Sequence, residues 1–119
     1  MTLQEVIAFC ESLGEVEPRR PYGPQPLVMF YQGRKAFCNI MEDTLPLHIV
    51  MKCDPMEAEI LRAACPSIRP GYHVNKRHWN SVFLDGTLPD EEIKRMLRNA
   101  YLLVSGRKKE VVGIQPTSL

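Results

Sequence analysis

Three apolar runs separated by very short connections place the strongest constraint on how this 119-residue chain folds. The runs are Leu27–Tyr31, Lys35–Met41 and Leu47–Lys52, joined by the turn residues Gln32-Gly33 and by a loop over residues 42–46. Runs of this length and composition are typical of strands, and connections this short join antiparallel neighbours. The sequence therefore predicts an antiparallel sheet in the middle of the chain.

Helix-forming patterns lie on both sides of these strands. Thr2 and Glu5 have the spacing of a capping box, which satisfies the free N–H groups at a helix start. Asp54 followed by Pro55 marks a second start, because aspartate caps free N–H groups and proline fits the first turn. The third start is an acidic run at residues 89–92, followed by apolar residues at helical spacing. The predicted helices cover residues 3–13, 54–64 and 89–106.

The remaining segments complete an α+β domain. Residues 15–26 contain four prolines. Proline lacks the N–H donor of a strand ladder, so this segment is predicted to be a loop. One or two further strands are expected before the last helix, ending with Trp79–Leu84. The order α-β-β-β-α-β-β-α predicts a single domain over residues 1–106, with about four to five antiparallel strands and helices on one face. Residues 107–119 are expected to form a flexible tail.

Alternation along the strands predicts which side chains face the helices and which face away. Those predicted to face the helices are Ala36, Cys38, Ile40, Leu47, Ile49, Met51, Val82 and Leu84. Those predicted to face away are Phe37, Asn39, His48, Lys52, Trp79, Ser81 and Phe83. The aromatic residues of the second group, with His48 and Lys52, would form an exposed binding patch. The alternative is that this register is wrong and Trp79 belongs to the core.

Cations, aromatic rings and amides interleave in residues 69–80, which we call the basic aromatic motif. Its candidate nucleic-acid- or anion-binding residues are Arg69, Tyr72, His73, Asn75, Lys76, Arg77, His78, Trp79 and Asn80. Lys76 and Arg77 are predicted to contact phosphates, because lysine offers a point charge and arginine a planar fork. Tyr72 and Trp79 are suited to stacking on bases. The alternative is that Arg77 pairs with an acidic neighbour, Asp85 or Asp90, and only fixes the loop.

The charge is unevenly distributed along the chain. The net charge of +1 is not that of a dedicated nucleic-acid binder. Residues 1–59 hold five Lys/Arg and nine Asp/Glu, whereas residues 60–109 hold ten Lys/Arg and four Asp/Glu. This asymmetry indicates a basic face, to which Lys94 and Arg98 of the last helix are expected to contribute.

Other kinds of chemistry have little support in the sequence. His73 and His78 lack a third metal ligand at a set spacing. The four cysteines contain no C-x-x-C pair and are expected to be reduced core residues. Ser81 and His78 would lie on opposite faces of a strand, so no catalytic pair is predicted. We therefore expect a non-enzymatic protein without metal or cofactor. The absence of a leader or membrane-spanning pattern favours a soluble, cytoplasmic protein.

The chain resembles the MmcQ/YjbR family. The resemblance rests on Arg69-Pro70-Gly71-Tyr72-His73, Asn75-Lys76-Arg77-His78-Trp79-Asn80, Leu84-Asp85-Gly86 with Leu88-Pro89-Asp90, Pro21-Tyr22-Gly23-Pro24 and Lys52-Cys53-Asp54-Pro55. It covers nearly the whole chain; Tyr22, where the family often has phenylalanine, and the tail after Arg107 depart from the pattern. The resemblance implies a fold similar to the bacterial frataxin homologue and, by analogy, DNA binding.

Two functions of different kinds follow from these expectations. One is a monomeric module that binds DNA or RNA through the basic aromatic motif. The other is a protein-interaction domain that uses an exposed sheet face. The two differ in their response to salt, because phosphate contacts weaken steeply with salt and apolar contacts do not.

Overall fold

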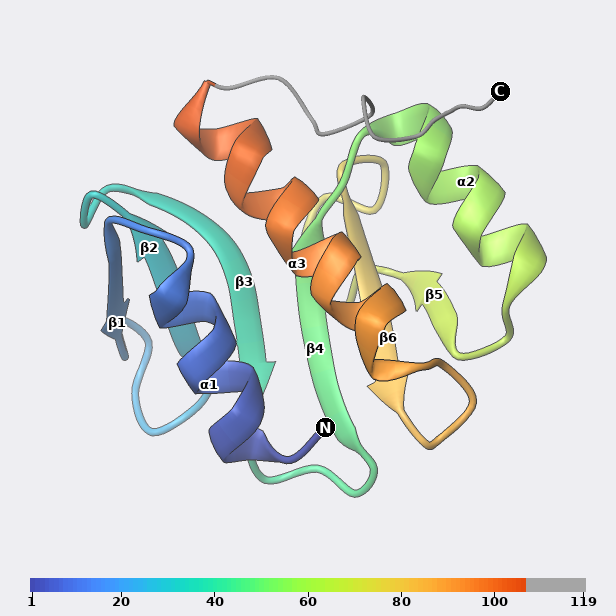
Figure 1. Cartoon of the computed structure of the whole chain (residues 1–119), viewed down its shortest axis with the longest axis horizontal. Coiled ribbons are helices and arrows are strands. Elements are labelled where there is room, and N and C mark those ends of the chain that lie inside the picture. The colour runs from blue at the N-terminus through green and yellow to red at the C-terminus, as the bar shows by residue number, and fades with distance from the viewer. Residues whose placement is uncertain (107–119) are drawn as a thin grey trace.

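The computed structural model of the protein describes residues 1–106 (Figure 1). Its elements are α1 (Leu3–Ser12), β1 (Val16–Arg19), β2 (Leu27–Tyr31), β3 (Lys35–Met41), β4 (Leu47–Lys52), α2 (Pro55–Ala64), β5 (Ile68–Pro70), β6 (Trp79–Leu84) and α3 (Asp90–Ser105). The six strands form one antiparallel sheet in the order β1-β2-β3-β4-β6-β5. The predicted α+β class is confirmed. The predicted tail lies outside the described residues.

The helices begin where their capping residues indicate. The Glu5 N–H donates to the Thr2 hydroxyl at 3.1 Å, and the Thr2 N–H donates to the Glu5 carboxylate at 2.8 Å. At the start of α2 the Asp54 carboxylate accepts from the Glu57 N–H at 3.2 Å. Helix α3 ends at Gly106, whose φ of 77° few other residues adopt. Among residues 1–106, no helix is both long and apolar enough to span a bilayer.

Strand β1 is an element that sequence reasoning missed. It lies within the segment predicted to be a loop and contains Pro18, which pairs with Met29 of β2. Because β1 is at the sheet edge, only one of its sides needs ladder donors, and an edge strand tolerates proline. The prediction of an irregular 15–26 segment is therefore wrong for residues 16–19, and the sheet has six strands.

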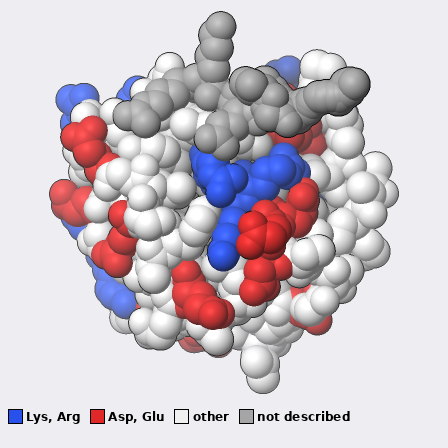
Figure 2. All heavy atoms as spheres, viewed as in Figure 1, with Lys and Arg blue, Asp and Glu red and all other residues white. Residues whose placement is uncertain are grey.

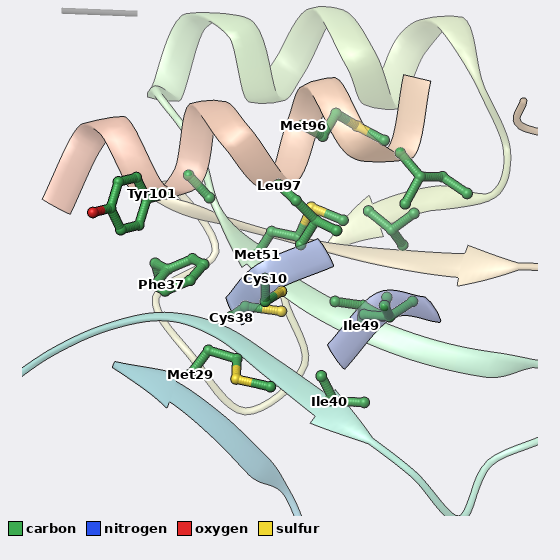
Figure 3. Packing of buried hydrophobic residues seen from close by; sticks show 14 of the residues in the cluster. Cys10, Met29, Phe37, Cys38, Ile40, Ile49, Met51, Met96, Leu97 and Tyr101 are labelled. Atoms are coloured by element: carbon green, nitrogen blue, oxygen red, sulfur yellow. The ribbon is translucent and has the colours of Figure 1, made fainter. Parts of the chain in front are cut away.

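The core lies between one face of the sheet and the helices. Helices α1 and α3 cross this face (Figure 1), and α2 packs against β5 and β6. Side chains from the sheet and from α3 interleave there, including Met29, Ile40, Ile49, Met51 and Leu97 (Figure 3). The thiols of Cys10 and Cys38 are buried in contact with each other, and burial raises the pKa of the Cys38 thiol. The four cysteines form no disulfide; Cys10, Cys38 and Cys65 are buried as predicted, whereas Cys53 is half-buried.

A β-bulge changes the predicted faces of β3. Met29 pairs with Cys38 and Phe30 with Ala36, so Phe37 is the extra residue of the bulge. A one-residue bulge shifts the alternation, and Phe37 therefore points to the helices beside Cys38. It is fully buried, with its ring edge-on to Tyr101 at 5.6 Å between centroids (Figure 3). The predictions that Phe37 faces away and that Ala36 joins the core are wrong.

Replacing Phe37 with alanine tests this register. We expect the Phe37→Ala variant to lose about 3–5 kcal/mol of unfolding free energy, since it opens a cavity in the core. The matched control is Phe30→Ala on the opposite face, where the ring is half-buried under Arg19 and its loss costs about 1 kcal/mol. Urea denaturation measures both. Equal losses for the two variants would contradict the bulge.

Candidate functional site

The helix-free face of the sheet carries a continuous row of paired side chains, one from each strand. In spatial order the row is Arg19, Val28, Asn39, Val50, Ser81 and Arg69. An arginine therefore lies at each edge of the sheet, and the amide of Asn39 lies between two valines that are each 1% exposed. Asn39 faces away from the helices, as predicted.

Two loops lie over this face and leave a pocket between them, which we call the sheet pocket. Its volume is about 190 Å³. Its lining comprises Tyr22 and Pro26 from the first loop, Asn39, Met41 and Val50 from the strands, and Tyr72, His73 and Val74 from the second loop. The predicted open patch is therefore wrong: Phe37 is in the core, and His48 is only 6% exposed. The loops convert a flat sheet face into a concave site.

The first loop, residues 20–26, is tied to the end of β3. Arg20 donates to the Pro24 carbonyl at 2.7 Å and forms an ion pair with Glu42. The Gln25 amide donates to the Glu42 carboxylate at 3.2 Å and accepts from the Glu42 N–H at 2.9 Å. The hydrogen bond from Arg20 holds the pKa of the Glu42 carboxyl below its usual range. The wall that carries Tyr22 is therefore fixed by polar contacts.

The second loop, residues 71–78, is fixed by close packing and by hydrogen bonds to β6. A side chain at Gly71 would lie 2.8 Å from Cβ of Trp79 and 2.7 Å from the Val74 side chain, so only glycine fits. The Tyr72 N–H donates to the Ser81 hydroxyl at 2.9 Å. The Lys76 ammonium donates to the Gly71 carbonyl at 2.8 Å and closes the loop.

Arg62 of α2 braces the same loop from the helix side, a role that sequence reasoning missed. Its guanidinium donates to the Asn80 amide oxygen at 2.6 Å, to the Trp79 carbonyl at 3.2 Å and to the Lys76 carbonyl. The one hint in the sequence was that Arg62 is a basic residue in the last turn of α2. Because one guanidinium binds three oxygen acceptors in and beside the second loop, the position of this loop depends on α2.

Most residues of the basic aromatic motif are exposed. Tyr72 is 50% exposed, and the His73 ring lies against it at 3.8 Å between centroids. The Asn75 side chain accepts from the Arg77 N–H at 2.9 Å and leaves the Arg77 side chain at the surface. The Arg69 guanidinium lies 5.1 Å from the Phe83 ring centroid.

Three motif residues lie deeper. His78 and Trp79 are half-buried, and the Lys52 ammonium lies 5.7 Å from the Trp79 ring centroid. Asn80 is 2% exposed, and its amide donates to the Ala58 carbonyl of α2 and accepts from Arg62. It faces the helices, because it alternates with Trp79 along β6. Asn80 was predicted as a binding residue, but the structure buries it in a structural role.

Lys94 and Arg98 do not join the motif. Both lie on α3 with their cationic groups over the Phe9 ring, at 5.8 and 5.7 Å from its centroid. Figure 2 shows this helix-side face, where Lys and Arg side chains lie among Asp and Glu. Arg95 pairs with Glu92 at 2.6 Å and Lys94 with Glu91 at 3.6 Å. The helix side thus carries mixed rather than basic charge.

Comparison with known proteins places the chain in a family. The family model described as YjbR matches residues 11–103. The chain belongs to the YjbR family. The YjbR family resemblance inferred from the sequence is thereby confirmed. Relatives include the uncharacterized protein YjbR of Escherichia coli K12, 38% identical over 68 residues, and the uncharacterized protein YbdF of E. coli O157:H7, 39% identical over 84 residues.

These matches cover different shares of each relative. The YjbR match covers 57% of this chain and about half of that protein (52%), whereas the YbdF match covers 71% and 68%. Among solved structures, Deinococcus radiodurans protein DR2400, with domain DUF419, is 36% identical with a TM-score of 0.82, covering 99% of this chain and 91% of that one. A Pseudomonas syringae protein is 27% identical with a TM-score of 0.75, covering 87% and 98%.

In this YjbR-family chain, the segments that carry the resemblance meet at the helix-free face. The segment 21–24 and the basic aromatic motif supply the two walls of the sheet pocket. The segment 52–55 lies beside the motif, since the Cys53 N–H donates to the His78 carbonyl at 2.8 Å. Tyr22 and Asn39 were not among the predicted site residues, because the pocket unites segments far apart in the chain. Among residues 1–106, no three His, Cys, Asp or Glu side chains converge to hold a metal ion.

His48 is a buried histidine beneath the second loop. Its ring stacks on Phe83 at 4.3 Å and lies 6.0 Å from the Tyr72 ring. Its Nε2 has no hydrogen-bond partner among the described residues. Burial lowers the pKa of the imidazole below its ordinary value.

The lowered pKa of His48 predicts a pH-dependent stability. The unfolded chain takes up a proton near pH 6.5 while the folded protein resists it, so stability should fall as pH drops below about 6.5. His48→Phe keeps the stack and removes this proton. As the pH falls from about 7.5 to 5.5, we expect the wild type to lose more unfolding free energy than the His48→Phe variant. His73 and His78 are present in both proteins, so parallel pH profiles would contradict the assignment to His48.

His73 lines the pocket in a strained backbone conformation. Its φ is 58°, and among residues 1–106 the other non-glycine residue with positive φ is Gln32 at 53°. Glycine adopts this conformation without the clash of a Cβ atom.

Relieving the strain should stabilise the protein. We expect His73→Gly to raise the unfolding free energy by up to about 1 kcal/mol. Gln32→Gly, in the β2–β3 turn, is the matched control and should change in the same direction. Thermal denaturation compares them. A clear loss for His73→Gly alone would mean that the ring contact with Tyr72 outweighs the strain.

Proposed function

We propose that this protein is a non-enzymatic binding protein that holds a strand of DNA or RNA across its helix-free face. Cations without a carboxylate partner that lie beside aromatic rings on the helix-free face support this proposal most strongly. Phosphates would bind the cations, and unpaired bases would stack on the rings. The proposal includes a monomer that acts in the cytoplasm.

The cations of this face differ from those of the helix side. Among the described residues, Lys52, Arg69 and Arg77 take part in no ion pair. Lys52 and Arg69 lie instead over the rings of Trp79 and Phe83. A cation without a carboxylate partner keeps its full attraction for phosphate, whereas the paired cations of α3 would have to give up existing contacts.

The aromatic side chains favour unpaired bases over a duplex. Tyr22 is 76% exposed and Tyr72 is 50% exposed, and they stand on opposite walls of the pocket. Bases can be stacked on such rings only when they are free of the helical stack. The alternative of a protein-interaction domain relied on an open apolar patch, and Phe37 and His48 of that patch are buried. The exposed rings and the cations without carboxylate partners therefore favour strand binding.

Removing the two arginines tests the proposal. In the Arg69→Gln/Arg77→Gln variant, binding to a labelled single strand should weaken for all sequences. The slope of log affinity against log salt should be shallower by about 1.4, at about 0.7 per phosphate on a single strand. Lys76 is left in place because its ammonium holds the loop. Fluorescence anisotropy at several salt concentrations gives the slopes.

The matched control removes the same charge from the other side of the molecule. Lys94→Gln/Arg98→Gln should leave both affinity and salt slope close to the wild type, because these side chains lie on the helix side. Equal effects of the two double variants would show only a dependence on net charge. Absence of binding by the wild type at low salt would overturn the proposal and favour a protein partner.

A further inference from the structure

We propose that the sheet pocket binds a single unpaired nucleobase and that the Asn39 amide hydrogen-bonds to the edge of this base. This inference rests on the proposed strand binding but concerns a separate step. The arginines would hold the strand, whereas the pocket would distinguish one base from another.

The Asn39 amide at the pocket floor lacks a partner within the protein. Among residues 1–106, its side chain has no hydrogen-bonding partner, and it is half-buried where it lines the pocket. Its neighbours across the ladder are Val28 and Val50, which are both buried. An amide offers two N–H donors and an oxygen acceptor, and leaving them unmatched between apolar groups costs stability unless water or a ligand pairs with them. Because Asn39 is half-buried, its amide is open to water in the free protein and is available to a ligand that enters the pocket.

The size of the pocket fits one planar ring system. Its volume of about 190 Å³ far exceeds the roughly 10–15 Å³ that one water needs. It is smaller than the roughly 300–1,000 Å³ of pockets that take drug-sized ligands. A group of one or two fused rings matches this range, and a whole nucleotide strand does not.

The walls offer contacts that suit the faces of such a ring. Tyr22 stands on one wall, and Tyr72 with His73 stands on the other. Base faces stack on aromatic rings, and single-stranded bases are recognised in this way. Arg77 lies on the same loop as His73, where it can hold the phosphate of the bound nucleotide. Both walls are fixed by hydrogen bonds before a ligand arrives, which lowers the entropic cost of binding.

The amide distinguishes a base from an aromatic side chain of a protein partner. A phenyl ring in the pocket would leave the donors and acceptor of Asn39 unpaired. A base presents complementary donors and acceptors, and asparagine pairs bidentately with adenine. We therefore expect adenine to be the preferred base.

The experiment compares single strands of equal length and charge. The probes are labelled oligodeoxynucleotides that contain only adenine, only thymine, only cytosine or only abasic sites. The wild type should bind the adenine strand roughly tenfold more tightly than the abasic strand. Asn39→Leu should reduce the preference for the adenine strand over the thymine and cytosine strands to near one with an unchanged salt slope, whereas stacking on the pocket walls should still favour the adenine strand over the abasic strand. Asn99→Leu on α3 is the control and should keep the wild-type preference for adenine.

A second variant keeps the volume of the side chain. Asn39→Asp has only acceptors, so its preference should move towards cytosine, which presents an amino donor. The Asn39→Leu protein should unfold close to the wild-type temperature, because the half-buried Asn39 amide has no hydrogen-bonding partner among residues 1–106 to lose. A loss of base preference therefore cannot be attributed to unfolding.

The outcomes separate this inference from the proposed function. An abasic strand that binds as tightly as the adenine strand overturns the base pocket, and strand binding through Arg69 and Arg77 then stands. An Asn39→Leu variant that keeps the wild-type preference also overturns it. A salt slope that is unchanged in the Arg69/Arg77 variant counts against the proposed function itself.

Discussion

The contacts of Tyr101 determine which face of the sheet the helices cover. Its ring meets Tyr31 and Phe37 edge-on, at 5.5 and 5.6 Å, and so joins α3 to β2 and to the bulge of β3. Its hydroxyl accepts from the Glu15 N–H at 3.3 Å, at the turn from α1 to β1. A Cβ atom at Gly14 would lie 2.5 Å from this hydroxyl, so the turn can approach only as glycine. One side chain thus connects both N-terminal and C-terminal helices to the same face, and the other face is left to loops.

This division explains how a small sheet can be both stable and functional. Apolar packing on the helix side supplies the favourable burial. The loops on the other side bury less apolar surface. They are held by polar contacts, from Arg20 to Glu42 and from Arg62 to the carbonyls near Trp79. Hydrogen bonds fix direction as well as distance, so the pocket walls are ordered without a second hydrophobic core. Concave sites with a few well-placed polar groups are the usual form of binding sites.

Sequence reasoning succeeded where the information was local. Capping at Thr2 and Asp54 and the short connections of the central strands fixed the helices and the antiparallel order. It failed where pairing decided the outcome. Pro18 led to the prediction of a loop where the structure has the edge strand β1. The bulge at Phe37 turns that ring towards the helices, opposite to the predicted face. The burial of His48 and the pocket above Asn39 depend on a loop more than twenty residues away along the chain, which no local pattern reveals.

Unfavourable local features gather around the sheet pocket. His48 carries the one buried side-chain atom without a partner among residues 1–106, and His73 has a positive φ. Both features lower stability, and each could be removed by a simple substitution. Asn39 adds a half-buried amide that faces the pocket. In natural proteins, local conformation, packing and hydrogen bonding usually all favour the same structure, and the exceptions are commonly found at functional sites. The helix side of the same molecule has capped helices, paired charges and a dense core. The contrast between the two faces therefore locates the functional surface on physical grounds, independently of the charge of the basic aromatic motif.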